Sequence, residues 1–297
     1  MTTSLDNTLR LPLTHGLSVR LWLGGLKLLS TVLLGAGLMG IVPWVSQGQD
    51  TYPWPLAPAV TVAGIPVFLV GLLWAGVLLG AWHHWQVKRL ERQGWELLRA
   101  GRPDAAIRAF TGAAYEGRKS LRARSYHGLT LAWLRQGDYE RALSFGEATT
   151  RAWGQGTRAL REARAPGVMA AILALYGVPD EAQHWVERIR RPMFDKTDYA
   201  LLAQAVLLCR AGRYVEAVKR IQSATRENVP ELDVGAVAVL HAFARGRLGG
   251  QLVPLKLGCV LPEKPVRASQ YEYLAREWPE LAAFLQARDA AAVHCPA

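Results

Sequence analysis

Four short segments of the chain repeat one pattern of glycine and alanine at nearly regular intervals. They are GRPDAAIRAF from Gly101, GDYERALSFG from Gly137, GVPDEAQHWV from Gly177 and GRYVEAVKRI from Gly212. In each, an alanine follows the glycine by five residues and a large apolar residue precedes it by four: Ala106, Ala142, Ala182 and Ala217, and Leu97, Trp133, Leu173 and Leu208. The glycines are 36, 40 and 35 residues apart. A period of this length is typical of a solenoid of stacked repeats.

This pattern predicts a helix, a tight turn and a second helix in every repeat. Glycine ends the first helix because it adopts a left-handed backbone conformation that side chains resist. Acidic residues such as Asp104 and Glu140 then suit the positive end of the second helix. Alanine at the first inward position lets the two helices approach closely. We therefore expect an all-α fold with about four helix pairs.

The repeats resemble the tetratricopeptide repeat, an antiparallel helix pair of about 34 residues. The best copy, residues 87–120, has small or aromatic residues at the family's positions: Gly94, Ala106, Phe110 and Ala113. The second copy is residues 123–156, and copies from about residues 163 and 198 depart further from the family's pattern. The third copy starts poorly, because Pro166 lies inside its first helix. The resemblance covers residues 87–230, and residues 231–297 are expected to form helices that close the solenoid, one of them within VRASQYEYLAREW.

Family resemblance also implies a binding surface, because exposed positions of the first helices line a concave groove that holds a peptide. Carried over position by position, these are Arg92, Arg99, Arg124, His127, Arg135 and Arg164. An acidic segment of a partner protein would dock there through charge-assisted hydrogen bonds. The alternative is that arginines such as Arg99 and Arg135 only complement the dipole at the ends of their helices. The family's asparagines for chaperone tails are missing here, which argues against such a partner.

Two apolar segments precede the repeats. Residues 28–45 and 59–82 contain no charged side chain, and an apolar helix of about 20 residues spans a membrane. The sequence therefore predicts a two-helix transmembrane hairpin, with a cytoplasmic leader at residues 1–27 and an external loop at residues 46–58. A cleaved signal peptide is the alternative for the first segment, although its leader is long and no A-x-A site follows it.

Basic residues indicate the direction of this hairpin. They lie on both sides of it, at Arg10, Arg20 and Lys27 and at Lys88, Arg89 and Arg92. The connecting loop contains Asp50 but no Lys or Arg. The positive-inside rule then places the N- and C-termini in the cytoplasm. A composition rich in Arg, Leu, Gly and Ala indicates a bacterial protein and hence the inner membrane.

The stretch AWHHWQVKRLERQGW, residues 81–95, contains two adjacent histidines that could suggest a metal or haem site. Neighbouring residues of a helix point about 100° apart, so His83 and His84 cannot bind one metal ion together. The apolar segments offer no other metal ligand. We therefore expect no metal and no cofactor.

Tryptophans and basic residues of the same stretch fit a membrane surface instead. Trp82 and Trp85 are expected at the inner interface, and Trp44 and Trp54 at the outer one. Lys88 and Arg89 would contact anionic lipid head groups.

The charge is strongly positive, with 35 Lys and Arg against 24 Asp and Glu and a net charge of +11. This balance suits an anionic lipid surface, an acidic protein partner or nucleic acid. The basic clusters at residues 118–124 and 188–192 lack accompanying stacking aromatics, so we expect no nucleic acid. No nucleophile elbow, dinucleotide fingerprint, P-loop or zinc-protease motif occurs, so we expect no enzyme.

Together these features predict a membrane-anchored adaptor or scaffold that binds a protein partner at the cytoplasmic face. Tethering would raise the partner's effective concentration there, for the assembly or regulation of a membrane complex. The alternative is an accessory structural subunit held mainly through the hairpin, whose glycines suit packing against other membrane helices. An enzyme or nucleic-acid binder on the solenoid surface is the remaining alternative.

Overall fold

The computed structural model describes residues 61–62, 65–117, 119–152, 158–190, 195–249 and 268–293. The chain forms two compact units, residues 1–89 and residues 90–297. The predicted leader, first apolar segment and external loop, residues 1–58, lie outside the described residues.

In the first unit, two-residue strands precede a long helix. β1 (Thr61–Val62) pairs antiparallel with β2 (Ile65–Pro66), and α3 (Val67–Arg99) follows directly. The sequence prediction of a helix from residue 59 is wrong about this start. Pro66 lacks a backbone N–H and disfavours helical backbone at the residue before it, so the helix begins after the proline. No helix in the described part of the chain is both long and apolar enough to cross a membrane.

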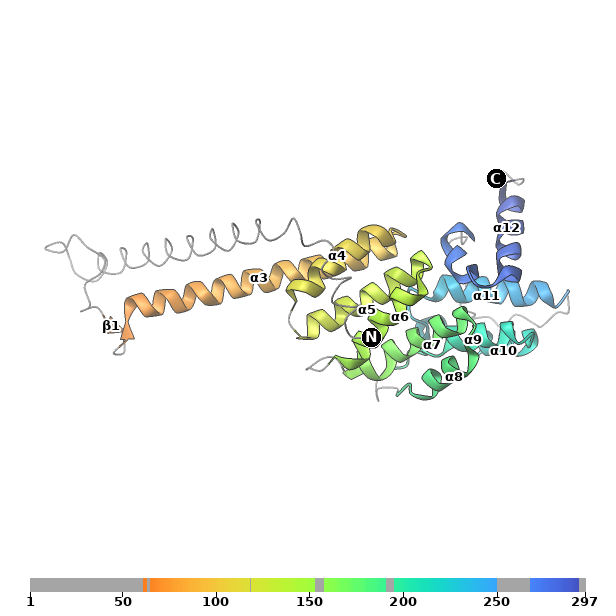
Figure 1. Cartoon of the computed structure of the whole chain (residues 1–297), viewed down its shortest axis with the longest axis horizontal. Coiled ribbons are helices and arrows are strands. Elements are labelled where there is room, and N and C mark those ends of the chain that lie inside the picture. Colours follow the sequence, from red (N-terminus) through yellow and green to blue (C-terminus); the bar gives the residue numbers. More distant parts are fainter. Residues whose placement is uncertain are drawn as a thin grey trace. The chain divides into compact units, whose positions relative to one another are not determined.

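Helices of the second unit follow one another in pairs, which confirms the all-α prediction (Figure 1). The end of α3 pairs with α4 (Pro103–Glu116), α5 (Lys119–Gln136) with α6 (Tyr139–Arg151), α7 (Ala165–Tyr176) with α8 (Pro179–Glu187), and α9 (Leu201–Arg210) with α10 (Tyr214–Gln222). Each pair packs on the next, and α5 contacts α7 just as α7 contacts α9. The first helices of successive pairs therefore form one layer.

The four pairs are joined by the same turn. Gly101, Gly137, Gly177 and Gly212 have φ angles of 70°, 75°, 92° and 70°. The N–H of the residue after each glycine donates to the carbonyl five residues earlier, as from Arg102 to Leu97 and from Arg213 to Leu208, both at 2.9 Å. This is the Schellman arrangement that ends helices. The predicted glycine turns are confirmed.

Small residues let the paired helices approach each other. Ala106, Ala142, Ala182 and Ala217, the alanines of the repeated pattern, are completely buried. They begin the inward face of each second helix, as the sequence predicted.

Pro166 lies inside the first helix of its pair, as the sequence indicated. A π-helical turn, η1 (Leu160–Arg164), leads directly into α7. Pro166 has no N–H to donate to the carbonyl of Glu162, four residues earlier. That carbonyl instead accepts the backbone N–H of Arg190 at 2.7 Å. The wider π turn and this distant donor accommodate the proline within a continuous helical run.

Beyond the pairs, the described residues form η2 (Arg226–Asn228), α11 (Val234–Arg247), η3 (Ala268–Ala275) and α12 (Pro279–Val293). The helix expected within VRASQYEYLAREW is present as η3, which is a 3₁₀ helix. Its successive residues Tyr273, Leu274 and Ala275 are all buried. Burial of three consecutive residues shows that η3 packs against the rest of the chain on more than one side.

Residues 273–278, here called the C-terminal strap, contact the turn between α5 and α6 and the C-terminal end of α9. The Tyr139 hydroxyl donates to the carbonyl of Tyr273, and the guanidinium of Arg276 donates to the carbonyl of Gln136. Arg210, the last residue of α9, donates to the carbonyls of Leu175 at 2.7 Å and Glu277 at 2.6 Å. The strap thereby contacts the last residue of α5, the first residue of α6 and the last residue of α9, and Arg210 also donates to a carbonyl near the end of α7.

Candidate partner-binding groove

A groove of about 470 Å³ lies among α3, α5, α7 and the start of α9. One further wall is the segment of residues 229–233, which connects η2 to α11 and is called the acidic segment because it contains Glu231 and Asp233. The residues that line the groove form an apolar floor and carry basic side chains at the rim.

Residues predicted from family resemblance divide into three groups. Four of them line the groove: Arg99, Arg124, His127 and Arg164. Arg135 lies beside it, with its guanidinium donating to the carbonyl of Leu232 in the groove wall. Arg92 is exposed on α3 and does not contribute to the lining.

The floor is built around Trp95 and the ring of Phe110, whose centroids lie 5.1 Å apart in an edge-to-face arrangement. Phe110 occupies space that two glycines leave free. A Cβ atom on Gly94 would lie 2.7 Å from this ring, and one on Gly128 would lie 2.5 Å from it. Both distances are too short for real contacts, so the absence of side chains at these positions lets α3, α4 and α5 converge beneath the groove.

Glu91 links α3 to α5 at one side of the groove. Its Oε1 atom accepts the indole N–H of Trp95 at 3.1 Å and lies 2.9 Å from Nε of Arg124. The carboxylate is buried while the guanidinium is half exposed. Arg124 therefore reaches the rim of the groove while its Nε atom contacts Glu91. A buried carboxylate needs such partners to compensate its lost hydration.

On the opposite side, Arg164 and Tyr199 form the rim. Nε of Arg164 donates to the Tyr199 hydroxyl at 3.1 Å, and this hydroxyl donates to Oδ2 of Asp195 at 2.9 Å. Burial opposes the ionisation of Asp195, but hydrogen bonds from Thr197 and Tyr199, together with the charge of Arg164, hold the pKa of that carboxyl below its usual value. Gly167 of α7 permits this arrangement, since a Cβ there would lie 2.5 Å from the Tyr199 carbonyl oxygen.

At the remaining end of the groove, the acidic segment provides interaction partners for Arg99 and Arg135. Nε of Arg99 lies 3.1 Å from Oε2 of Glu231, and Arg135 donates to the Leu232 carbonyl. The guanidinium of Arg135 also lies over the ring of Tyr273, 5.3 Å from its centroid. Burial raises the pKa of Asp233 to about 6, against the opposing charge of Arg135. Arg99 and Arg135 therefore both make contacts within the fold. These contacts alone favour neither the interpretation of the two arginines as groove residues nor their interpretation as charges that complement helix dipoles.

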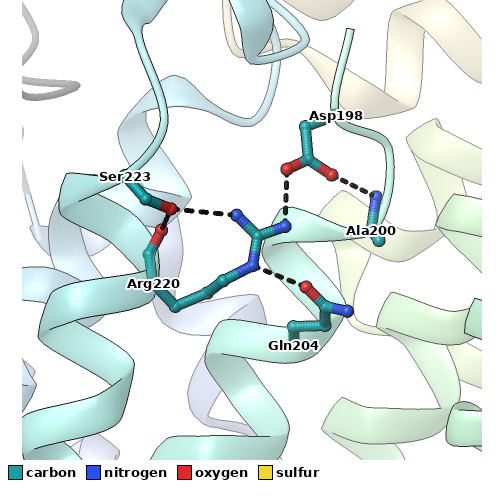
Figure 2. A network of polar contacts seen from close by, with 5 residues as sticks. All are labelled: Asp198, Ala200, Gln204, Arg220 and Ser223. Carbon is teal, nitrogen blue, oxygen red and sulfur yellow. Dashed lines mark hydrogen bonds and ion pairs between the residues drawn. The ribbon is translucent and has the colours of Figure 1, made fainter.

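A second polar network fixes the loop that enters α9 (Figure 2). The Arg220 guanidinium contacts Asp198 and donates to Oε1 of Gln204 at 2.6 Å. Oδ1 of Asp198 accepts the N–H of Ala200, and the N–H of Asp198 donates to the Asn228 carbonyl at 2.6 Å. Asp198 thus fixes the loop around Tyr199 through its carboxylate, and it holds Asn228, the residue preceding the acidic segment, through its backbone N–H.

His127 lies in the groove floor as a neutral side chain. Burial, with a smaller contribution from the charge of Arg164, lowers its pKa to about 3. Its Nδ1 atom has no hydrogen-bond partner among the described residues. The imidazole therefore cannot attract an acidic partner by charge at neutral pH, and it serves as an uncharged part of the floor beside Trp95.

The residues predicted at a membrane interface are described only in part. Trp44 and Trp54 lie outside the described residues. Trp82 and Trp85 are 55% and 51% exposed, and their ring centroids lie 5.3 Å apart. Arg89 places its guanidinium 5.7 Å from the centre of the Trp85 ring, and Lys88 is exposed.

Sequence reasoning missed Trp95, Tyr199 and the acidic segment. Trp95 stands four positions from Arg99, so helical spacing alone could have placed it on the groove face. Tyr199 and Glu231 carried no such signal, because their positions depend on contacts between distant parts of the chain.

Comparison with known proteins identifies no relative of this chain. The chain matches no protein-family model, no curated protein and no solved structure.

Proposed function

We propose that the chain is a membrane-anchored adaptor whose groove binds an acidic, partly apolar segment of a protein partner. The observation that carries the proposal is the pairing of Arg99, Arg124 and Arg164 at the rim with an apolar floor containing Trp95. Guanidinium groups bind carboxylates through strong, directional hydrogen bonds. Apolar surface between them would hold a hydrophobic side chain of the same segment.

The tetratricopeptide assignment belongs to this proposal. It is supported by helix pairs joined through glycine turns and by buried alanines at one position of each pair. Location of the groove on the layer of first helices agrees with the family's mode of peptide binding.

The membrane anchor is likewise part of the proposal. Its support is the apolar, uncharged character of residues 28–45 and 59–82. Along the described part of α3, large apolar side chains are exposed at helical spacing: Trp74, Val77, Leu78, Trp82 and Trp85. An exposed apolar stripe of this kind is typical of a membrane or protein interaction surface. We propose the bacterial inner membrane, with both termini in the cytoplasm.

No catalysis is proposed for the groove. Recruitment needs only binding, and the anchor raises the partner's local concentration without any reaction. A protein segment is preferred to nucleic acid because the guanidinium groups surround an apolar floor rather than forming a continuous basic track.

A site-specific crosslinking experiment on the full chain in its native membrane tests the proposal. A photoreactive residue replaces Val168 in the groove, and a matched one replaces Arg108, which is exposed on α4 outside the lining. We expect the groove position to capture a protein through a segment containing Asp or Glu. Arg99→Gln and Arg164→Gln should each weaken capture, and Arg108→Gln should not.

Equal capture from both positions, or capture insensitive to the groove arginines, would contradict the proposal. Crosslinks to nucleic acid would instead support the alternative of a nucleic-acid binder.

The exposed apolar stripe on α3 favours a second candidate, an accessory subunit held mainly by its membrane segments. Removal of residues 1–82 distinguishes the two. An adaptor keeps its groove-dependent partner in solution, whereas an accessory subunit loses its complex.

A further inference from the structure

The acidic segment brings into the groove the same chemistry that the proposed function expects from a partner. It places a carboxylate, Glu231, on a rim arginine, and it adds apolar side chains, Val229, Pro230 and Leu232, to the wall. The chain therefore already contains an acidic, partly apolar stretch bound at one end of its own groove.

The backbone of this segment is fixed at both ends. Before it, the carbonyl of Asn228 accepts the N–H of Asp198 at 2.6 Å. After it, the carbonyl of Asp233 accepts the N–H of Val237 at the start of α11, at 2.9 Å. Arg135 holds the middle through the Leu232 carbonyl. Release of the whole segment would break all of these hydrogen bonds.

The Glu231 side chain is held far less firmly than this backbone. It is 74% exposed, and its partner Arg99 is 51% exposed. Ion pairs between exposed side chains contribute little to stability because water competes for both charges. Exchange of this one carboxylate for another is therefore possible without moving the backbone.

From these contacts we infer that Glu231 is an intramolecular competitor for Arg99, and that a bound partner places its own carboxylate where Glu231 lies. This inference rests on the proposed function of the groove. Glu231 is tethered within reach of Arg99, so its effective concentration is far above that of a free partner. The competition lowers the groove's affinity for acidic segments and selects partners that also fill the apolar floor.

The test measures binding of a fluorescent synthetic peptide to the full chain in detergent micelles. The peptide ENVPELDVG repeats residues 227–235 and thus supplies the carboxylates and apolar residues of the acidic segment. Glu231→Gln should bind this peptide about two- to fivefold more tightly than the unaltered chain, as expected for removal of a surface ion pair. The gain should disappear in the double variant Glu231→Gln with Arg99→Gln.

Glu227→Gln is the matched control, because Glu227 is exposed just before the acidic segment and does not line the groove. It should leave the affinity unchanged. Circular dichroism checks that each variant keeps its helical content.

Two failures are distinguishable. Peptide binding that falls in Arg164→Gln but does not rise in Glu231→Gln would overturn the competition and leave the proposed function standing. Lack of groove-dependent binding even by Glu231→Gln would overturn both.

Discussion

Glu91 and Arg124 form an ion pair in which only one partner is removed from water. Their Oε1 and Nε atoms lie 2.9 Å apart, with side-chain exposures of 3% for Glu91 and 52% for Arg124. The buried carboxylate depends on the arginine, whereas the arginine can be hydrated without it. The two residues are therefore not equivalent as targets of mutation.

Arg124→Ala should destabilise the chain more than Glu91→Gln does. Loss of the guanidinium leaves a buried carboxylate with Trp95 as its hydrogen-bond donor, which we expect to cost about 2 to 3 kcal/mol. Gln at position 91 can still accept from Trp95, so its cost should be about 1 kcal/mol or less. Chemical denaturation followed by circular dichroism measures both. The double variant should recover part of the Arg124→Ala loss, and strict additivity would contradict this account.

Gly128→Ala should destabilise the groove floor by overpacking it. The added Cβ would lie 2.5 Å from the Phe110 ring, and such insertions cost about 1 to 3 kcal/mol. The smaller side chain of Phe110→Leu should relieve part of this cost in a double variant. The thermal midpoint of each variant is the measurement.

Gly112→Ala is the matched control for that substitution. A Cβ on Gly112 has its nearest neighbour, Leu90, at 3.6 Å, which is ordinary contact. Alanine favours helix over glycine by roughly 0.5 to 1 kcal/mol, so this variant should be neutral or more stable. A loss as large as that of Gly128→Ala would show that space around Phe110 is not the cause.

Gly212→Ala should cost about 1 kcal/mol through backbone conformation alone. Its φ is 70°, and a Cβ would meet no atom within 4 Å. Gly137→Ala should cost more, because a Cβ there would also lie 2.9 Å from Cδ of Arg276. Asparagine tolerates the left-handed conformation better than alanine, so Gly212→Asn should lose less. Equal shifts of the denaturation midpoint in Gly137→Ala and Gly212→Ala would contradict this account.

Stability should fall as the pH falls from about 6.5 toward 3, in part because of His127. Its folded-state pKa is about 3, below the unfolded value of 6.5, so within this window the unfolded chain binds the extra proton. His127→Leu should flatten the dependence of unfolding free energy on pH. Denaturant titrations across this range provide the measurement.

The contribution of Asp233 to the pH dependence of stability has the opposite sign to that of His127, so the experiment needs a control for Asp233. Its folded-state pKa is raised to about 6, so its contribution to stability falls as the pH rises from about 4 to 6. The His127 comparison is therefore made in an Asp233→Asn background. An unchanged pH slope on replacement of His127 there would contradict its assignment as a buried neutral side chain.

Local features of the fold were predictable from sequence because their causes are local. The glycine turns and buried alanines follow from backbone conformation and helix spacing within a few residues. The position of Pro166 inside a helix was predicted, but its accommodation was not, because this depends on the N–H of Arg190, which lies 24 positions further along the chain. The start of α3 was missed because apolar composition outweighed the local effect of Pro66.

The helical residues that line the groove were predictable from sequence, but the acidic segment was not. Arg99, Arg124, His127 and Arg164 follow from the register of the first helices, so family resemblance brought them together. The role of Glu231 depends on how residues 229–233 cross between two helices, and no periodic pattern specifies such a path. Sequence therefore indicated a surface for acidic ligands without revealing that the chain supplies a carboxylate itself.

The C-terminal strap changes how a repeat array of this kind should unfold. Stacked repeats make contacts between neighbours, so each can open at its own free energy in sequence along the array. The strap adds contacts across 134 residues, from Tyr139 to Tyr273, and across 67 residues, from Arg210 to Glu277. They join the strap to the start of α6 and to the end of α9, so both form only when these two helices are in place. We expect the strap to make the three helix pairs from α5 to α10 unfold as one cooperative unit, and to delay their folding until the strap has been synthesised.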